Sequence, residues 1–99
     1  MNFVKGILVV AAIAAPAQTS DVAIDNFRFA APAITVPVGT TVTWTNRDDV
    51  PHNVVSTDNA FKSPVLDTDE MFSHKFEAAG TYKYYCSIHP RMTGQVVVR

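Results

Sequence analysis

The sequence predicts an all-β protein, an antiparallel Greek-key β-sandwich of about seven to eight strands. Short runs of alternating apolar and polar residues recur along the chain, and turn-forming residues separate them. After residue 17, no run has the 3.6-residue period of an amphipathic helix. Short strands at regular spacing with turns between them are typical of two packed antiparallel sheets.

The first 17 residues are predicted to lie outside this sandwich. Lys5 is followed by an uncharged apolar run over residues 6–15, and Ala15-Pro16-Ala17 has the small residues of a signal-peptidase site. The run is shorter than the roughly 20 residues of a membrane-spanning helix. We therefore expect an export signal over residues 1–17, a domain over residues 18–99, a periplasmic location and no stable membrane insertion.

The net charge gives no indication of nucleic-acid binding, and the single cysteine favours a bound metal over a disulfide. Residues 18–99 carry seven basic and nine acidic side chains, a net charge of −2 that gives no indication of nucleic-acid binding. Cys86 is the only cysteine, so an internal disulfide cannot stabilise this small domain. A metal bound at Cys86 would protect the thiol and add binding free energy to the folded state.

The first half of the domain contains three predicted strands. Residues 22–29 alternate loosely, and Ala30-Ala31-Pro32 ends that run. Residues 34–38 are predicted to form an edge strand, because Pro37 cannot donate a hydrogen bond to a ladder. The clearest strand spans residues 41–46, with one face formed by Val42, Trp44 and Asn46.

The middle of the chain is mostly turn. Residues 47–51 have the composition of a turn, residues 52–56 resume an extended run, and Pro64 leaves residues 61–66 ambiguous. The acidic residues of this part are interpreted as solvated turn residues; they are Asp48, Asp49, Asp67, Asp69 and Glu70.

Three strands are predicted after it. The strand over residues 71–76 has Phe72, His74 and Phe76 on one side. The strand over residues 81–86 has Tyr82, Tyr84 and Cys86 on one side. The last strand is rich in valine and spans residues 95–99.

Four residues form a candidate metal site. Cys86, His89 and Met92 lie within seven residues of one another and offer a thiolate, an imidazole and a thioether. Copper accepts a Cys sulfur, two imidazoles and a weakly held Met sulfur in one site. His52 is the candidate for the second imidazole, because the loops of a sandwich gather at its two ends and could bring residue 52 to the Cys86 loop.

These motifs resemble the cupredoxins, the type 1 blue copper proteins. The resemblance lies in His52-Asn53, in residues 80–86 and in the Cys-x-x-His-x-x-Met spacing, which is similar to the short ligand loop of amicyanins. It implies one copper ion per chain, with His52, Cys86 and His89 as equatorial ligands and Met92 as the axial one. It also implies that Asn53 hydrogen-bonds Ser87 and so holds the Cys86 sulfur in place.

The resemblance further implies an electron carrier rather than an enzyme, monomeric, with His89 as the electron port. A quinoprotein amine dehydrogenase would be the donor and a c-type cytochrome the acceptor. The loop differs from the amicyanin pattern at Ile88 and Arg91, where a proline and an aromatic residue are usual. The ligands are unaffected, but Arg91 would place a positive charge beside the port.

Three alternatives stay open on the sequence alone. An exported copper carrier or chaperone would need an exchangeable site. A fragment of a multicopper enzyme would need more histidines than the three present. A metal-free sandwich would leave Cys86 as a buried thiol. His74 is expected to be a strand or surface residue and Met71 a packing residue, neither of them a metal ligand.

Overall fold

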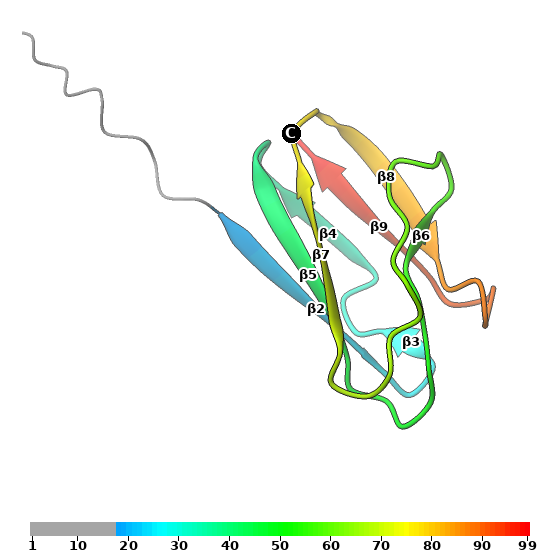
Figure 1. Ribbon diagram of the computed structural model, residues 1–99. Coiled ribbons are helices and arrows are strands. Elements are labelled where there is room, and N and C mark those ends of the chain that lie inside the picture. The colour runs from blue at the N-terminus through cyan, green and yellow to red at the C-terminus, as the bar shows by residue number, and fades with distance from the viewer. Residues whose placement is uncertain (1–17) are drawn as a thin grey trace, which may run out of the picture.

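The computed structural model describes residues 18–99, so the predicted export signal over residues 1–17 lies outside the described residues. Within residues 18–99 every regular element is a strand, and no helix is long and apolar enough to cross a membrane. Two four-stranded sheets pack face to face, as Figure 1 shows. This arrangement confirms the predicted all-β sandwich.

The first sheet has the strand order β3-β2-β5-β7 and the second the order β4-β9-β8-β6. The strands of the first sheet are β2 (Thr19–Asp25), β3 (Arg28–Phe29), β5 (Thr40–Asn46) and β7 (Met71–Phe76). Those of the second are β4 (Ala33–Val36), β6 (Val55–Ser56), β8 (Gly80–Tyr85) and β9 (Thr93–Val98). As predicted, the strand that precedes Pro37 is an edge strand.

The sheets are mixed rather than purely antiparallel. β2 pairs with β5 in parallel, and β4 pairs with β9 in parallel. The reason is the path of the chain, which leaves the first sheet after β3, forms β4 in the second sheet and returns beside β2 in the same direction. The ends of β2 and β5 therefore lie at one pole of the sandwich.

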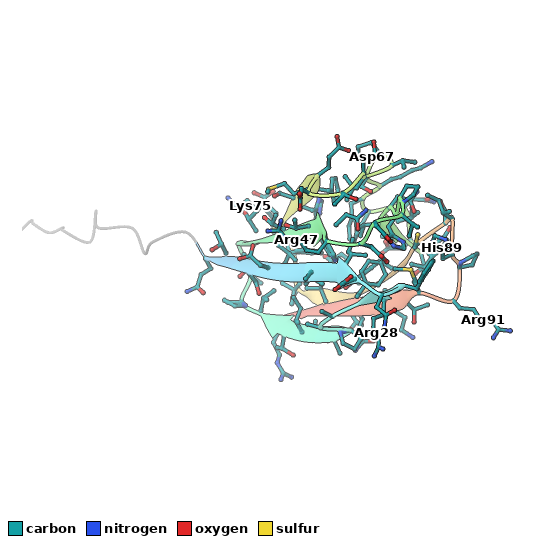
Figure 2. The ribbon with its side chains drawn as sticks, turned by 90° about the horizontal axis from the view of Figure 1, so that it is seen from below. Arg28, Arg47, Asp67, Lys75, His89 and Arg91 are labelled. Atoms are coloured by element: carbon teal, nitrogen blue, oxygen red, sulfur yellow. The ribbon has the colours of Figure 1, made fainter. Side chains whose placement is uncertain are left out.

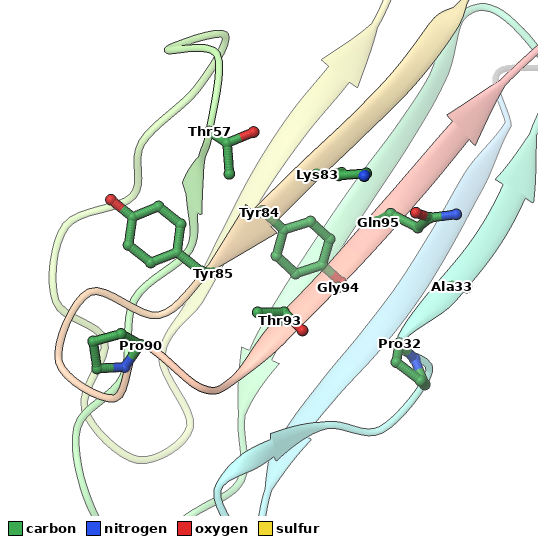
Figure 3. A pocket seen from close by; sticks show the side chains of 10 residues that line it. All are labelled: Pro32, Ala33, Thr57, Lys83, Tyr84, Tyr85, Pro90, Thr93, Gly94 and Gln95. Carbon is green, nitrogen blue, oxygen red and sulfur yellow. The ribbon is translucent and has the colours of Figure 1, made fainter.

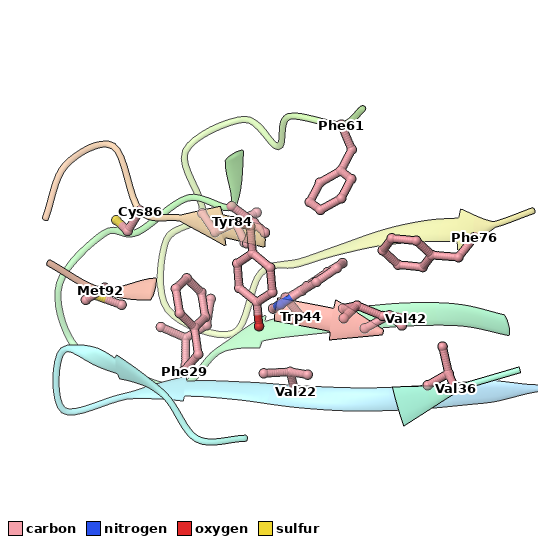
Figure 4. Close-up of a cluster of buried hydrophobic side chains, with 14 of the residues drawn as sticks. Val22, Phe29, Val36, Val42, Trp44, Phe61, Phe76, Tyr84, Cys86 and Met92 are labelled. Carbon is pink, nitrogen blue, oxygen red and sulfur yellow. The ribbon is translucent and has the colours of Figure 1, made fainter. Parts of the chain in front are cut away.

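The core follows the predicted alternation. In β5, Val42, Trp44 and Asn46 are all fully buried, while the threonines between them are partly exposed. Tyr84 in β8 is also buried, and its ring lies so close over Gly94 that a side chain at Gly94 would overlap it. Figure 4 shows Cys86 and Met92 at one end of this apolar cluster. Two of the four predicted metal ligands thus belong to the core cluster itself.

Candidate metal centre

His52 is positioned by the loop that follows β5. Its backbone exchanges two hydrogen bonds with Leu66, with N to O distances of 3.1 and 2.7 Å. The buried Asn46 side chain donates to the carbonyls of Val50 and Leu66, at 2.9 Å each, and accepts from the N–H of Asp48 at 2.9 Å. These bonds order the loop and hold His52 fully buried.

The other three donors come from one tight loop after β8. The N–H of Cys86 donates to the carbonyl of Met92 at 3.0 Å, and the N–H of Met92 donates to the carbonyl of His89 at 2.9 Å. These two bonds fold the loop back on itself, so all three side chains lie at the same pole. Cys86 and Met92 are buried, whereas His89 is partly exposed.

Three of the donor atoms form a compact triangle. Cys86 Sγ lies 3.8 Å from Nδ1 of His52 and 3.8 Å from Nδ1 of His89, and the two nitrogens are 3.2 Å apart. A point equidistant from these atoms is about 2.1 Å from each, which agrees with the roughly 2.0–2.3 Å bonds of imidazole and thiolate to a first-row ion such as zinc. The triangle therefore fits a single metal ion.

The chemistry of the donors selects the metal. A thiolate, two imidazoles and a nearby thioether are a soft set that suits copper, and hard ions such as Mg²⁺ or Ca²⁺ prefer oxygen ligands. Within residues 18–99, His52, Cys86 and His89 are the one group of three His, Cys, Asp or Glu side chains close enough to share an ion. The structure thus brings His52, Cys86 and His89 together as a set that suits copper, and the buried Met92 lies on the same loop as Cys86 and His89.

Asn53 and Ser87 join the two ligand-bearing loops. Asn53 donates from Nδ2 to Ser87 Oγ at 2.7 Å and accepts from the Ser87 N–H at Oδ1, also at 2.7 Å. The backbone N–H of Asn53 also points at the Cys86 sulfur, 3.5 Å away. This contact helps to orient the sulfur, and the paired bonds between Asn53 and Ser87 fix the separation of the loops.

Asp48 departs from its predicted role as a solvated turn residue. Its side chain is buried, and Oδ2 accepts hydrogen bonds from His52 Nε2 at 2.9 Å and from the N–H of Phe27 at 3.0 Å. These two bonds lower the pKa of Asp48 from 3.8 to about 2. The composition of residues 47–51 indicated a turn correctly, but it carried no sign that His52 and Phe27 would enclose this carboxylate.

This carboxylate sets the tautomer of His52. An ionised carboxylate only accepts hydrogen bonds, so Nε2 of His52 carries the ring proton. Nδ1, the atom that faces Cys86 and His89, then has a free lone pair for the metal.

The mouth of the site is largely apolar. A pocket of about 480 Å³ at this pole is lined by Phe27, Ile88, His89, Pro90, Arg91 and Met92. Phe27 and Ile88 are 51% and 42% exposed, so apolar side chains surround the accessible edge of His89. Figure 2 shows Arg91 extending from the end of the molecule that carries His89.

His74 lies outside the site, as expected. It is in β7 and its ring packs against those of Phe61 and Phe76, with centroids 4.8 Å away in each case. Burial lowers its pKa below the usual 6.5, with an opposing effect of the Glu77 charge. Met71, at the start of the same strand, is 62% exposed, so the expectation that it packs in the fold is wrong.

Comparison with known proteins agrees with this geometry. Residues 16–99 match the family model described as copper binding proteins, plastocyanin/azurin family. Amicyanin-alpha of Methylorubrum extorquens is 39% identical over 89 residues, which cover 85% of this chain and 75% of that protein. Amicyanin of Paracoccus denitrificans is 42% identical over 80 residues, covering 76% of this chain and 61% of that protein.

Solved structures are similar throughout the fold. A purple cupredoxin from Nitrosopumilus maritimus superposes with a TM-score of 0.77 at 41% identity, covering 81% of this chain and 99% of that one. Amicyanin from Paracoccus versutus also superposes with a TM-score of 0.77, at 33% identity, covering 86% of this chain and 85% of that one.

Proposed function

The chain belongs to the plastocyanin/azurin family of copper-binding proteins, and from this premise we propose that it shuttles single electrons through one copper ion held by His52, Cys86, His89 and Met92. Like the amicyanins and plastocyanins to which it is similar, it is an electron carrier and not an enzyme. The observation that carries the ligand assignment is the donor triangle, whose sides are 3.8, 3.8 and 3.2 Å.

Each ligand has a distinct part in this proposal. When bound, copper supplies one-electron chemistry between Cu(I) and Cu(II). Cys86 holds it as a thiolate, His52 and His89 as neutral imidazoles, and Met92 as a weak axial thioether. The hydrogen bonds of Asp48 and Asn53 hold these side chains before metal arrives, so little rearrangement opposes a change of charge at the site.

We infer that electrons enter and leave at His89. Its ring is partly exposed and forms part of the apolar pocket that also contains Met92. The larger groove of about 610 Å³, drawn in Figure 3, lies along the outer side of β8 and β9 and is lined by Tyr85, Lys83 and Pro90 among others. None of the four proposed ligands lines this groove, so we assign the port to His89 and not to the groove.

The proposed redox partners and cellular location follow from the similarity to amicyanins and from residues 1–17. By similarity to amicyanins, the donor would be a quinoprotein amine dehydrogenase and the acceptor a c-type cytochrome. Residues 1–17 would direct export to the periplasm, and residues 18–99 would form the domain. A monomer with a small apolar contact patch suits brief redox encounters, which bury less than about 1,200 Å².

The alternative, a copper carrier or chaperone, is less well supported. A carrier must release its ion readily to the next protein. Here His52 and Cys86 are fully buried, and hydrogen bonds join their two loops. Such a site favours retention of the metal.

A metal titration tests the proposed function. Purified protein is treated with Cu(II) and followed by visible absorption and electron paramagnetic resonance. An intense blue or purple band with a narrow copper hyperfine splitting is expected from thiolate coordination. Cys86→Ser should abolish the band, and His74→Gln, which changes a histidine outside the triangle, should leave it intact. An ordinary pale Cu(II) spectrum would overturn the ligand assignment.

A further inference from the structure

The turn between β2 and β3 has an unusual residue in it. Asp25 pairs with Arg28, so Asn26 and Phe27 form a two-residue hairpin loop. Their φ angles are 52° and 59°. Two successive positive φ values define a type I′ turn, in which Asn followed by Gly is the preferred pair. A bulky side chain at positive φ is a genuine outlier, so Phe27 occupies a position where local folding alone favours glycine.

Hydrophobic burial does not explain why a phenylalanine occupies this strained position, because half of the Phe27 side chain is exposed. Its ring instead meets two metal ligands. The Phe27 ring stands edge-on to His52, with centroids 5.7 Å apart, and edge-on to His89, with centroids 5.0 Å apart. Both contacts have the T-shaped geometry that aromatic pairs prefer.

The backbone of Phe27 is anchored to the same site. Its N–H donates to Asp48 Oδ2 at 3.0 Å, and this oxygen also accepts the hydrogen bond from His52 Nε2. One carboxylate oxygen therefore holds both the His52 ring and the turn that carries Phe27. The contact joins residues 21 positions apart in the chain, so it forms only in the folded domain.

Apart from their contacts with Phe27, the two histidines differ in how strongly hydrogen bonds and burial restrain them. His52 is buried, paired with Asp48 through its ring and with Leu66 through its backbone. His89 lies on a partly exposed loop, and among residues 18–99 its Nε2 has no hydrogen-bond partner. Two aromatic rings pack on the His89 ring from outside the ligand loop: that of Phe27, with centroids 5.0 Å apart, and that of His52, with centroids 4.9 Å apart. Of these two, Phe27 is the one that is not itself a proposed ligand.

From these contacts we propose that Phe27 is a positioning residue for the copper centre: anchored by Asp48, its ring holds His89 in the ligand position and covers the metal at the mouth of the site. The inference rests on the proposed function. Strain in the turn is then tolerated because the same conformation places the ring against His89. Without the ring, His89 would turn away from the metal more often, and copper would be lost faster.

Replacement by glycine separates the two effects of Phe27. Phe27→Gly relieves the turn and removes the ring, so the apo protein should melt at or above the wild-type temperature. The Cu(I) form should lose copper to a Cu(I)-specific chelator about 3- to 10-fold faster than wild type, from the strength of one or two aromatic contacts. The electron paramagnetic resonance spectrum of the Cu(II) form should also change.

Asn26→Gly is the matched control, since it alters the same turn and keeps the ring. Asn already suits this position of a type I′ turn, so the apo protein should gain no stability, and copper release should be unchanged. Phe27→Leu retains the apolar cover and the strained backbone without the aromatic edge, and it should release copper at an intermediate rate. If Phe27→Gly fails to fold, the copper-release rate of Phe27→Leu tests the proposal instead.

The outcomes are distinct. Copper release at the wild-type rate in both Phe27 variants, with unchanged spectra, would overturn the positioning role. A lowered melting temperature of apo Phe27→Gly with wild-type copper release would also overturn it, because Phe27 would then serve only packing. If wild-type protein itself forms no thiolate–copper band, the proposed function fails instead, whatever the variants do.

Discussion

The carboxylate of Asp48 lies 2.9 Å from Nε2 of His52, on the side of the ring opposite the metal-facing Nδ1. Both residues are buried, so solvent screens this bond only weakly. With copper held at Nδ1, the pair would form a carboxylate–histidine–metal arrangement, in which the carboxylate orients the ligand and raises its basicity. Asp48 thus belongs to the copper site although it is not a ligand.

Replacing Asp48 by Asn should weaken copper binding. The neutral amide keeps the size of the side chain but removes the negative charge that favours Cu(II) over Cu(I). We expect an affinity for Cu(II) about 10- to 100-fold lower, as is typical for such partners of metal ligands, and a higher reduction potential. Competition with a chelator and voltammetry measure these changes. Asp49→Asn, at an exposed position of the same loop, should alter neither value.

Acid should destabilise the apo protein through Asp48. Its pKa is about 2 in the folded state and 3.8 ordinarily, so the folded state favours the ionised form. The resulting stabilisation is complete above about pH 4 and is lost as the pH falls through about 2. Urea unfolding of the apo protein between pH 5 and about 2 should therefore show a loss of stability that Asp48→Asn reduces. An equal pH slope in both proteins would contradict this assignment.

Removing Asn53 should loosen the connection between the ligand loops. Asn53→Ala eliminates two hydrogen bonds to Ser87, and a net value of about 0.5–1.5 kcal/mol for each gives a loss of about 1–3 kcal/mol. Urea unfolding of the apo protein measures this loss. Ser87→Ala retains the bond from the backbone N–H to Asn53 Oδ1 and should have the smaller effect. Equal losses in the two variants would show that the side-chain bond carries all of the stabilisation.

Reversing the charge of Arg91 should change encounters with redox partners. Arg91 is exposed and lines the pocket beside His89, so it lies at the rim of the proposed contact. Charges at a rim mainly affect association rates and their salt dependence. Arg91→Glu should alter the ionic-strength dependence of electron transfer to a c-type cytochrome while the copper spectrum stays the same. Arg99→Glu, after the far end of β9, is the control for net charge. A changed copper spectrum in Arg91→Glu would instead indicate that Arg91 supports the site.

Copper should stabilise the domain strongly. A ligand present at 100 times its dissociation constant adds about 2.7 kcal/mol to the folded state. For a domain of this size each kcal/mol raises the melting temperature by about 4–8 °C, so we expect a rise of about 10–20 °C. Thermal melting of the apo and copper forms measures the difference. Equal midpoints would refute the idea that metal compensates for the absent disulfide.

Much of the fold could be predicted because it depends on local pattern. The alternation of Val42, Trp44 and Asn46 predicted the buried face of β5. The same period predicted that Tyr84 in β8 and Cys86, directly after it, point to one side, and both are buried. Pro37 indicated an edge strand because its missing N–H is a property of the residue itself. In each case neighbouring residues carry the information.

The ligand loop could also be proposed from the sequence. Cys86, His89 and Met92 are close in the chain, so any turn that closes the loop brings them together. Their chemistry selects copper irrespective of the rest of the fold. His52 required one further assumption, namely that two loops share a pole, and the structure brings it within 3.8 Å of Cys86.

Only the tertiary structure decided the surroundings of these ligands. Asp48 and Phe27 are polar and apolar residues in two separate turns, and nothing in either turn predicts that they meet each other or His52 and His89. The parallel pairing of β2 with β5 brings the two turns to one pole. The sequence by itself thus determined which atoms could bind the metal, because ligand chemistry and strand period are local. The packing of distant segments determined which groups orient them, because such contacts exist only after the sheets have formed.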